Sequence, residues 1–344
     1  MHAPGQEVGA NSGLTHPVGI QATGVFVPER VVTNAELTQF LDTSDEWIAS
    51  RTGIRRRRFL DEGFATSDMC IAAGRQALQR AAVDARDIDA IIIATFTPDQ
   101  PLPSTALIVS EALGTVRAMP FDLSQSACAG GIYALLVAAH LLQNEMFKNV
   151  LVIGADSGSR ATDPQDRGTR VFFGDAAGAA LLSRTSAGFG LLSWDTGSEL
   201  SYEVEIPAGG SRMPTSQKTI DARGNYLKMD GKAVWNMATD KLPRSIRQSA
   251  KLAGISVDQV DHFLLHQANL NIIKEAMLSL GVPLERAART VEEFGNTAAA
   301  SVFTALDQAM ESSTVKHGDH MILAGIGAGF MWGSLCFRHF EQGA

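Results

Sequence analysis

The stretch Val83-Asp-Ala-Arg-Asp-Ile-Asp-Ala-Ile-Ile-Ile-Ala94 has a counterpart later in the chain, Ile255-Ser-Val-Asp-Gln-Val-Asp-His-Phe-Leu-Leu-His266. Each begins with polar turn residues, continues into a short apolar strand, and follows a helix-like stretch over residues 71–82 or 241–252. Asp89 and Asp261 correspond, and their spacing (261 − 89 = 172) is half of the 344-residue chain. Such self-similarity predicts a duplicated α/β unit.

Two further pairs of segments keep nearly the same spacing. Asn149-Val-Leu-Val-Ile-Gly154 matches His320-Met-Ile-Leu-Ala-Gly325 (320 − 149 = 171). The small-residue segment that starts at Cys128 matches the one that starts at Asn296 (296 − 128 = 168). The strands are short and continuously apolar, which is typical of sheets covered by helices on both faces. Three pairings in the same order favour duplication over chance.

The duplication predicts how the chain is organised. We expect a flexible tail over residues 1–16, an N-terminal half over 17–187 and a C-terminal half over 188–344, because turn-forming glycines mark the boundary. If the halves pack about a pseudo-twofold axis, Cys128 and Asn296 begin equivalent buried helices. His266 then ends a strand nearby, and all three residues converge at one centre.

The composition excludes several functions. The chain is 45% hydrophobic and 19% charged, as expected for a compact globular protein, and its formal charge of -8 argues against nucleic-acid binding. Its start has no basic and apolar pattern of a signal peptide, and no apolar run reaches the length of a membrane span. Its three cysteines form no CxxC pair, so we expect neither a disulfide framework nor a metal site, and a cytoplasmic location.

The three convergent residues each have a functional and a structural interpretation. Cys128 followed by small residues at a helix start is suited to a nucleophilic thiolate, and its position fits an inert buried cysteine equally well. We expect Cys70 and Cys336 to be inert. Taken alone, His266 is more often a hydrogen-bonded core residue, and Asn296 a helix cap. The duplication favours the functional interpretation because it gives the three a reason to meet.

Two other motifs have ordinary structural explanations. Gly325-Ile-Gly-Ala-Gly329 is followed by a strand-like segment instead of the helix of a dinucleotide site, so we expect a tight strand-to-strand turn that lines a cavity. The run Arg55-Arg-Arg-Arg58 predicts a solvated or phosphate-facing loop. His262 lies four residues before His266 on an expected strand, which does not fit the helical spacing of metal ligands.

A set of ordered motifs resembles β-ketoacyl-acyl-carrier-protein synthase III, a thiolase-fold family of condensing enzymes. The motifs are Asp45-Glu-Trp-Ile48, Arg51-Thr-Gly-Ile-Arg55, Ala127-Cys-Ala-Gly130, Asp166-Arg-Gly-Thr169, Phe173-Gly-Asp175, His266-Gln-Ala-Asn269, Gly295-Asn-Thr297 and Gly329-Phe-x-Trp-Gly333. The resemblance covers residues 18–340 and implies an α/β fold, a five-layer αβαβα sandwich of two duplicated halves, and a homodimer.

The resemblance also implies a two-step reaction. Cys128 accepts an acyl group from an acyl-CoA, with the backbone N–H groups of Cys128 and Ala328 as the oxyanion hole. His266 and Asn296 then stabilise the enolate formed when a malonyl thioester, carried on an acyl carrier protein, loses CO2. The substrate is a coenzyme A thioester, and no tightly bound cofactor or metal is expected.

Further positions correspond to binding residues of the family. For CoA and its pantetheine arm these are Trp47, Arg167, Gly231, Trp235 and Asn269; for the acyl pocket they are Leu102, Phe173 and Ile326. Leu102 and Ile326 stand where aromatic residues are common, which suggests a starter acyl group other than acetyl. Asn271 stands where an arginine usually docks the carrier protein, which suggests a specialised carrier, or acyl transfer from or to CoA or a small molecule.

Two other functions compete with condensation. The same cysteine would also serve acyl transfer to oxygen, nitrogen or sulfur without condensation. A non-catalytic partner subunit of thiolase fold is the third possibility, and Cys128, His266 and Asn296 together argue against it. The sequence is equally consistent with fatty-acid initiation and with starter formation for polyketides or other secondary metabolites.

Overall fold

The N-terminal half is built on a five-stranded sheet. The computed structural model describes residues 13–124 and 127–341. The strands of this sheet are β1 (Val18–Phe26), β4 (Ala90–Ala94), β5 (Met119–Leu123), β6 (Asn149–Ser157) and β7 (Asp175–Arg184). Their order across the sheet is β1-β7-β6-β4-β5, in which β4 runs parallel to both neighbours and β7 antiparallel to its own.

The C-terminal half repeats this sheet with one strand fewer. Its strands are β8 (Gly190–Ser198), β11 (His262–Leu265), β12 (His320–Gly327) and β13 (Met331–Arg338), and their order is β11-β12-β13-β8. By position, β8, β13, β12 and β11 are the counterparts of β1, β7, β6 and β4. The counterpart of β5 is reduced to a single parallel bridge between Phe263 and Ala287.

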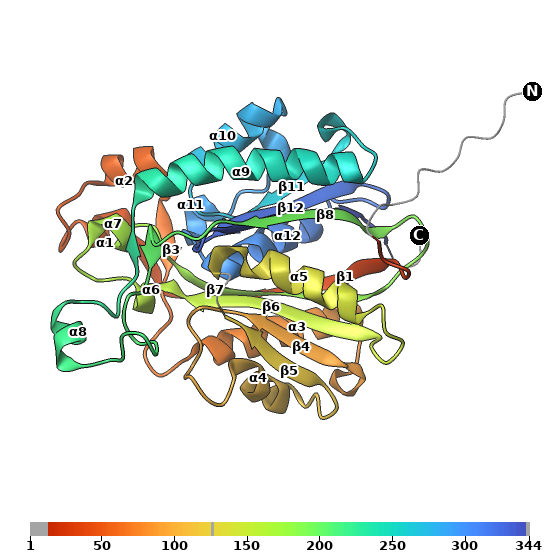
Figure 1. The fold of residues 1–344 in the computed structure, drawn as a ribbon, viewed down its shortest axis with the longest axis horizontal. Coiled ribbons are helices and arrows are strands. Elements are labelled where there is room, and N and C mark those ends of the chain that lie inside the picture. The colour runs from red at the N-terminus through yellow and green to blue at the C-terminus, as the bar shows by residue number, and fades with distance from the viewer. Residues whose placement is uncertain (1–12, 125–126, 342–344) are drawn as a thin grey trace, which may run out of the picture.

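Helices separate and cover the two sheets in five layers (Figure 1). Between the sheets lie α5 (Gly130–Leu141) and α12 (Ser301–Glu311), each entered through a 3-10 turn, η2 (Ala127–Ala129) or η5 (Ala298–Ala300). The outer faces carry α3 (Thr66–Ala81) with α4 (Thr105–Leu113), and α9 (Gly231–Leu252) with α10 (Leu270–Leu280). The expected αβαβα sandwich is confirmed.

The remaining elements are short and lie mostly at one end of the sandwich. They are β2 (Val31–Thr33), α1 (Asn34–Leu37), α2 (Asp45–Thr52), β3 (Arg56–Arg58), η1 (Ala85–Asp87), α6 (Gly158–Ala161), α7 (Arg167–Arg170), β9 (Val204–Glu205), α8 (Gln217–Asp221), β10 (Lys228–Met229), η3 (Val257–Gln259), η4 (Leu284–Arg286) and α11 (Val291–Phe294). In the part of the chain that the structure describes, no helix is both long and apolar enough to cross a bilayer.

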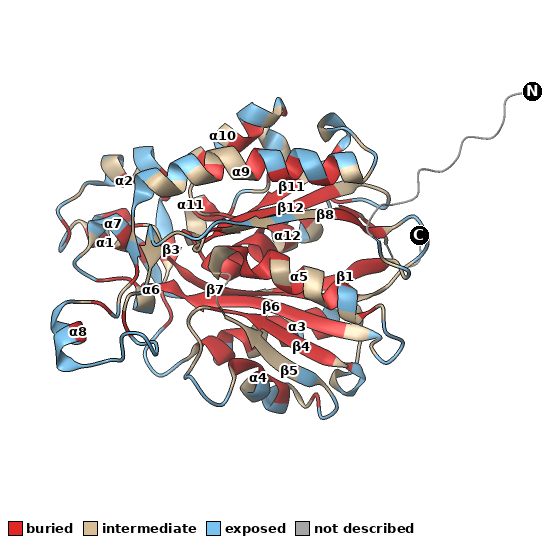
Figure 2. Ribbon diagram, in the orientation of Figure 1, coloured by how far each residue is buried: buried red, intermediate tan, exposed pale blue. Residues whose placement is uncertain are grey.

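The main core lies between the sheets, around α5 and α12, where Figure 2 shows an almost continuous buried interior. The turn η5 packs directly on β6, and the start of α12 packs on β7, because glycines leave room for them. A Cβ atom at Gly154 would lie 2.3 Å from the Ala299 carbonyl oxygen, and one at Gly178 would lie 2.4 Å from Cβ of Phe303. A side chain at either position would therefore push the two halves apart.

The structure corrects the register of the duplication at the helix starts. The turns η2 and η5 correspond at a spacing of 171 (298 − 127), and each begins with an alanine in the left-handed region, Ala127 at φ 41° and Ala298 at φ 46°. The counterpart of Cys128 is therefore Ala299, not Asn296, which precedes it by three residues. The two segments contain so many small residues that the sequence alone could not fix their alignment.

The arginine run is also different from the expected solvated or phosphate-facing loop. Arg56 to Arg58 form β3, and Arg57 is fully buried. Its guanidinium donates hydrogen bonds to the Asn34 side chain and to the Val171 carbonyl oxygen, both at 2.7 Å. These contacts give partners to the two terminal nitrogens of the guanidinium, although its Nε has none, and tie the α1–β3 region to the end of α7.

Only part of the expected tail can be compared with the structure. Residues 1–12 lie outside the described residues. His16 exchanges two hydrogen bonds with the Gln143 side chain, at 2.8 and 3.0 Å, just before β1 begins.

Candidate active site

Cys128, His266 and Asn296 line one cavity of about 110 Å³. Cys128 lies in η2, His266 follows the last residue of β11, and Asn296 lies just before η5. The cysteine comes from the N-terminal half and the other two come from the C-terminal half. The structure thus brings together the three residues that the sequence predicted to converge.

The backbone around Asn296 holds its amide in one orientation. Its side-chain Oδ1 accepts a hydrogen bond from the Ala298 N–H at 2.9 Å, so the amide NH2 is directed away from that peptide. The Asn296 N–H donates to the Phe172 carbonyl at 2.8 Å, and its carbonyl accepts from the Gly174 N–H at 3.0 Å. The Asn296 side chain donates a hydrogen bond to Cys128, which partly favours a thiolate there.

Cys128 is nevertheless a thiol in the resting protein. Its enclosed position raises its pKa to about 12, and the nearby carboxylate of Asp156 adds to this rise, while the Asn296 hydrogen bond opposes it. The start of the helix therefore does not lower the pKa of Cys128 below the ordinary value of a thiol.

His266 is neutral in this environment. Burial lowers its pKa to about 3, because the imidazolium would lose its hydration. Its Nδ1 forms a hydrogen bond with the Ser301 hydroxyl, and the Ser301 oxygen also accepts from the Gln267 N–H at 3.2 Å. Sequence reasoning did not single out Ser301, although it faces His266 from the first turn of α12.

The predicted turn after β12 lines the cavity as expected. Gly327 and Ala328 form part of the wall beside Cys128, and β12 pairs antiparallel with β13 across this turn. The Gly325–Gly329 motif is thus a strand-to-strand turn and not a dinucleotide loop. Gly327 and Ala328 bring the backbone, with little side chain, to the wall of the cavity that Cys128 also lines.

The same cavity collects most of the other predicted binding residues. Gly231, Trp235, Asn269, Phe173 and Ile326 all line it. Sequence reasoning missed several apolar wall residues, namely Val204, Met229, Val234, Ala238, Leu242, Ile272 and Phe330. A narrow, largely apolar tunnel that ends at polar side chains is suited to an extended thioester arm.

Trp47 and Arg167 lie outside this lining but contact each other. The Arg167 guanidinium carbon lies 5.3 Å from the Trp47 ring centroid, and one of its nitrogens donates to the Asp42 carbonyl at 2.7 Å. Trp47 lies on α2, whose C-terminal end is joined to the cavity by a hydrogen bond from the Asn269 side chain to the Arg51 carbonyl, at 3.1 Å.

A second cavity of about 640 Å³ reaches Cys128 from another side. It shares Cys128, Phe173, Val204 and Ala328 with the first cavity, and its other lining residues are mostly apolar: Phe96, Pro98, Pro101, Ser124, Ala127, Glu205, Ile206, Gly209, Leu227 and Gly329. The predicted pocket residue Leu102 lines neither cavity and is 85% exposed.

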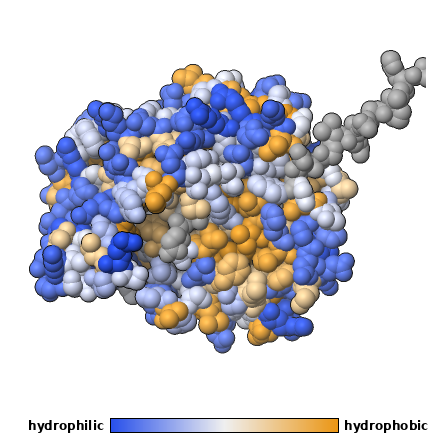
Figure 3. Space-filling model, viewed as in Figure 1, coloured by the Kyte–Doolittle hydropathy of each residue, from blue (hydrophilic) through white to orange (hydrophobic). Residues whose placement is uncertain are grey.

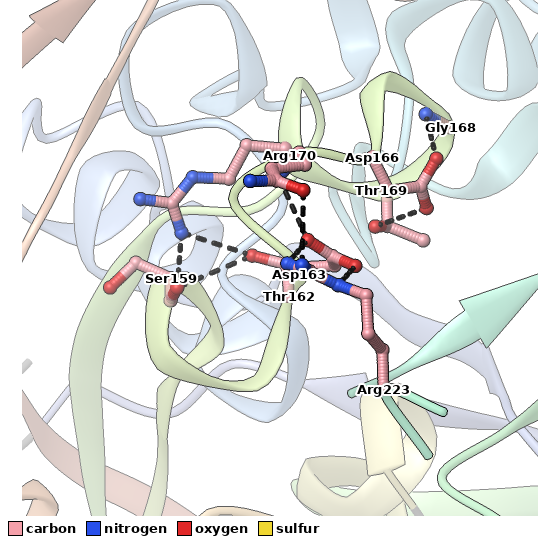
Figure 4. A network of polar contacts seen from close by, with 9 residues as sticks. Ser159, Thr162, Asp163, Asp166, Gly168, Thr169, Arg170 and Arg223 are labelled. Carbon is pink, nitrogen blue, oxygen red and sulfur yellow. Dashed lines mark hydrogen bonds and ion pairs between the residues drawn. The ribbon is translucent and has the colours of Figure 1, made fainter. Parts of the chain in front are cut away.

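The segment over residues 199–230, which includes α8, forms part of the wall of both cavities. A charged pair ties this segment to the main body: Asp163, in the loop after α6, accepts hydrogen bonds from the Arg223 guanidinium (Figure 4). Arg170 lies beside this pair, with its guanidinium donating to the Ser159 carbonyl. No periodic pattern in residues 199–230 identifies this wall from the sequence alone.

Asn271 has a structural role in this chain. Its side-chain amide donates to the Ser50 and Arg51 carbonyls, at 3.0 and 2.9 Å, and so caps the end of α2. This contact holds α2 against α10 beside the cavity mouth. Among the described residues, no group of three or more His, Cys, Asp or Glu side chains is placed to hold a metal ion.

The comparisons with known proteins agree with this architecture. Residues 121–199 match the family 3-oxoacyl-[acyl-carrier-protein] synthase III, and residues 250–339 match its C-terminal region. The chain is 42% identical to the β-ketoacyl-[acyl-carrier-protein] synthase III of Symbiobacterium thermophilum over 324 residues, covering 94% of this chain and 98% of that protein.

Two solved structures are similar over nearly the whole chain. The 3-oxoacyl-[acyl-carrier-protein] synthase III of Aquifex aeolicus has a TM-score of 0.86 at 35% identity, covering 94% of this chain and 100% of its own. The priming β-ketosynthase of the R1128 polyketide pathway has a TM-score of 0.87 at 31% identity, covering 98% and 99%. With this fold, and with Cys128, His266 and Asn296 around one cavity, the chain belongs to the β-ketoacyl-[acyl-carrier-protein] synthase III family of thiolase-fold enzymes.

Proposed function

We propose that this protein primes chain synthesis by loading an acyl group from an acyl-CoA onto Cys128 and condensing it with a malonyl thioester. The product is a β-ketoacyl thioester, for fatty-acid initiation or for the starter step of a polyketide or other secondary metabolite. The observation that carries this proposal is the meeting of Cys128 with His266 and Asn296 from the opposite half in one cavity.

The first step is acyl transfer to sulfur. Cys128 Sγ attacks the thioester carbonyl, the new C–S bond forms, and CoA leaves as a thiol that carries the proton lost by Cys128. The backbone N–H groups of Cys128 and Ala328 stabilise the negative oxygen of the tetrahedral intermediate. Because the resting cysteine is protonated, attack and proton loss are coupled, and a thiolate does not accumulate.

The second step is decarboxylative condensation. The malonyl carboxylate leaves as CO2, and the electron pair it leaves behind forms an enolate that attacks the acyl carbonyl on Cys128. The C–C bond forms, the C–S bond to the acyl carbon breaks, and the Cys128 thiolate that departs takes up a proton from water to restore the thiol. A neutral His266 and the amide of Asn296 stabilise the enolate oxygen as hydrogen-bond donors. The Asn296 orientation supports this role, because its Oδ1 is already occupied by the Ala298 N–H.

The Ser301 contact supports a donating His266. The Ser301 oxygen accepts from the Gln267 N–H, which leaves its own hydroxyl proton for Nδ1 of His266. A neutral imidazole that accepts at Nδ1 carries its proton on Nε2. We therefore assign Nε2–H as the donor to the malonyl thioester oxygen.

We further propose that the two cavities divide the substrates. The narrow cavity that contains Gly231, Trp235 and Asn269 takes the pantetheine arm, and the second cavity takes the acyl chain of the starter. A volume of about 640 Å³ with apolar walls exceeds the need of an acetyl group and is suited to a longer or branched starter. Binding of the CoA adenine between Trp47 and Arg167 requires the guanidinium to separate from the indole, which it contacts here.

The partners we propose are an acyl-CoA, a malonyl thioester on an acyl carrier protein or on CoA, and a second copy of this chain. The proposed dimer face is at the open edge of β5, where Val116 is 79% and Met119 is 42% exposed. Figure 3 shows hydrophobic residues gathered on the side that carries α5 and β5. Light scattering after gel filtration would measure the oligomeric state. We also propose a cytoplasmic location, which the free cysteines support.

The proposal is tested by measuring CO2 release from a malonyl thioester in the presence of a panel of acyl-CoAs. Condensation predicts CO2 and β-ketoacyl product in equal amounts, both dependent on the acyl donor and both absent for Cys128→Ala. Acyl transfer to oxygen, nitrogen or sulfur without CO2 release would overturn it in favour of simple acyl transfer. Fast acetyl condensation with slow longer starters would overturn the chain-length proposal alone.

A further inference from the structure

Asp156 is a fully buried carboxylate to which the mechanism above assigns no role. It lies near the end of β6, in the N-terminal half, and accepts hydrogen bonds from both halves. Its Oδ1 accepts from the Phe96 N–H at 2.9 Å and from the Thr95 hydroxyl at 3.0 Å. Its Oδ2 accepts from the Ala299 N–H at 3.0 Å, across the interface between the halves. Burial raises the pKa of this carboxyl to about 7, and the hydrogen bonds from both halves favour its ionised form.

The Ala299 peptide is close in sequence to the groups that orient Asn296. The Ala298 N–H, one peptide earlier, holds the Asn296 Oδ1. Ala298 itself has a φ of 46°, a left-handed conformation that costs free energy in a residue with a Cβ atom. Such a conformation requires that the adjoining residues are fixed by other contacts, and the Asp156 carboxylate fixes Ala299 by accepting its N–H.

The duplication shows what the same position does in the other half. At the spacing of 171, Ala299 corresponds to Cys128 (299 − 128) and Asp156 corresponds to Gly327 (327 − 156). In the C-terminal half a glycine therefore stands where the carboxylate would be, and Gly327 lines the cavity beside Cys128. In the C-terminal half, the N–H of Ala299 is occupied by the Asp156 carboxylate. At the corresponding N–H of Cys128, Gly327 supplies no side chain, which leaves room for the thioester oxygen that we propose binds there.

We propose that Asp156 is a positioning residue for condensation, which holds the Ala299 peptide and thereby fixes the amide of Asn296 toward the reacting thioester. This inference rests on the proposed function. Acyl loading of Cys128 uses the Cys128 and Ala328 N–H groups, neither of which Asp156 contacts in this geometry. The two half-reactions should therefore respond differently to loss of the carboxylate.

The charge of Asp156 should increase the difference between the effects of its removal on acyl loading and on condensation. Burial raises the pKa of Asp156 to about 7, so the carboxyl is largely ionised at pH 8 and its charge there raises the pKa of Cys128. At that pH its removal would ease acyl loading and not slow it. A general loss of folding, in contrast, would reduce both half-reactions in proportion to the active protein. Opposite or unequal effects on the two steps are therefore diagnostic of positioning.

The test is the variant Asp156→Asn in the full-length protein. Asparagine keeps the shape and can still accept from the Phe96 N–H, but its NH2 group then faces the Ala299 N–H and the bond across the halves is lost. We expect acyl loading, followed by mass spectrometry, to stay within about twofold of the wild type or to be faster. We expect CO2 release by the pre-acylated enzyme to fall about tenfold or more.

The matched control is Asp89→Asn, at the opposite end of β6. Asp89 also accepts from two backbone N–H groups, those of Lys148 and Asn149, at 2.6 and 3.0 Å. The partners of its side chain lie at the start of β6 and not in η5, so any loss there should affect both steps equally. A proportional loss of both steps in Asp156→Asn, as in this control, would overturn the proposal.

A second measurement does not depend on the reaction. Hydrogen exchange of the peptide that contains residues 296–300 should be faster in Asp156→Asn than in the wild type, and unchanged in Asp89→Asn. Unchanged exchange in both variants would overturn the positioning role. If the wild type releases no CO2 at all, the proposed function fails, whereas this exchange experiment still decides whether Asp156 holds the Asn296 segment.

Discussion

The hydroxyl of Ser301, in the first turn of α12, forms a hydrogen bond with Nδ1 of His266, which follows β11. Both side chains are buried, so the bond is shielded from water and sets which imidazole nitrogen faces the cavity. Through this contact a helix from the centre of the sandwich controls the chemistry of a residue at a strand end.

Removal of that hydroxyl should slow condensation selectively. We expect Ser301→Ala to reduce CO2 release about ten- to a hundredfold, as for loss of one buried hydrogen bond of about 1–3 kcal/mol, while acyl loading of Cys128 is retained. Thr304→Val is the matched control, because it removes a buried hydroxyl one turn later on α12 that bonds to Thr290 and not to His266. Equal losses in the two variants would contradict the tautomer assignment.

Substitutions of His266 and Asn296, the two proposed donors to the enolate, should affect condensation more than acyl loading of Cys128. We expect His266→Ala and Asn296→Ala each to reduce CO2 release by about 10²–10³, with much smaller effects on acyl loading from acyl-CoA. Stopped-flow measurement of CoA release and a separate assay of CO2 would resolve the steps. A variant of either residue that condenses at the wild-type rate would remove it from the mechanism.

The resting thiol predicts a specific pH dependence. Because the pKa of Cys128 is raised to about 12, the thiolate fraction rises with pH throughout the accessible range. Alkylation of Cys128 by iodoacetamide should therefore accelerate about tenfold per pH unit between pH 8 and 10, above the pKa of about 7 to which burial raises Asp156, without a plateau. A plateau near pH 7 would show a thiolate already stabilised at neutral pH. His266 should not contribute an inflection in this range, since its pKa is about 3.

A larger side chain at Ile206 should reduce the volume of the second cavity, which we propose holds the acyl chain. Ile206 lines the second cavity only, and we expect Ile206→Trp to lower kcat/KM for long or branched acyl-CoAs about tenfold while acetyl-CoA changes little. Ile220→Trp, on the exposed surface of α8, is the control for a bulky substitution in the same segment. If Ile206→Trp affects all chain lengths alike, the second cavity does not hold the acyl chain.

Much of the fold could be predicted because duplication leaves a repeated pattern of apolar strands. The pairs that start at Asn149 and His320, and at Asp89 and Asp261, align in the structure as they do in the sequence. The alignment of Cys128 with Asn296 was three residues wrong, because alanine and glycine carry little information on register. The left-handed alanines that fix the register have no distinctive sequence signal.

The sequence predicted the three central residues of the site, but not the buried residues that hold them in position. Polar residues at strand and helix ends identified Cys128, His266 and Asn296, but not the partners that hold them. Asp156 was overlooked although a charged residue in an otherwise apolar strand is itself a signal of buried hydrogen bonding. The burial of Arg57 was missed because a run of arginines is usually solvated, and only the tertiary contacts with Asn34 and Val171 make burial possible.

The most direct test is intact-protein and peptide mass spectrometry after the enzyme is mixed with an acyl-CoA and no malonyl thioester. The peptide with Cys128 should gain the mass of one acyl group and lose it when a malonyl thioester is added, with release of CO2. An acyl group on another residue, or condensation that continues in Cys128→Ala, would contradict the assignment of this sulfur as the acyl carrier.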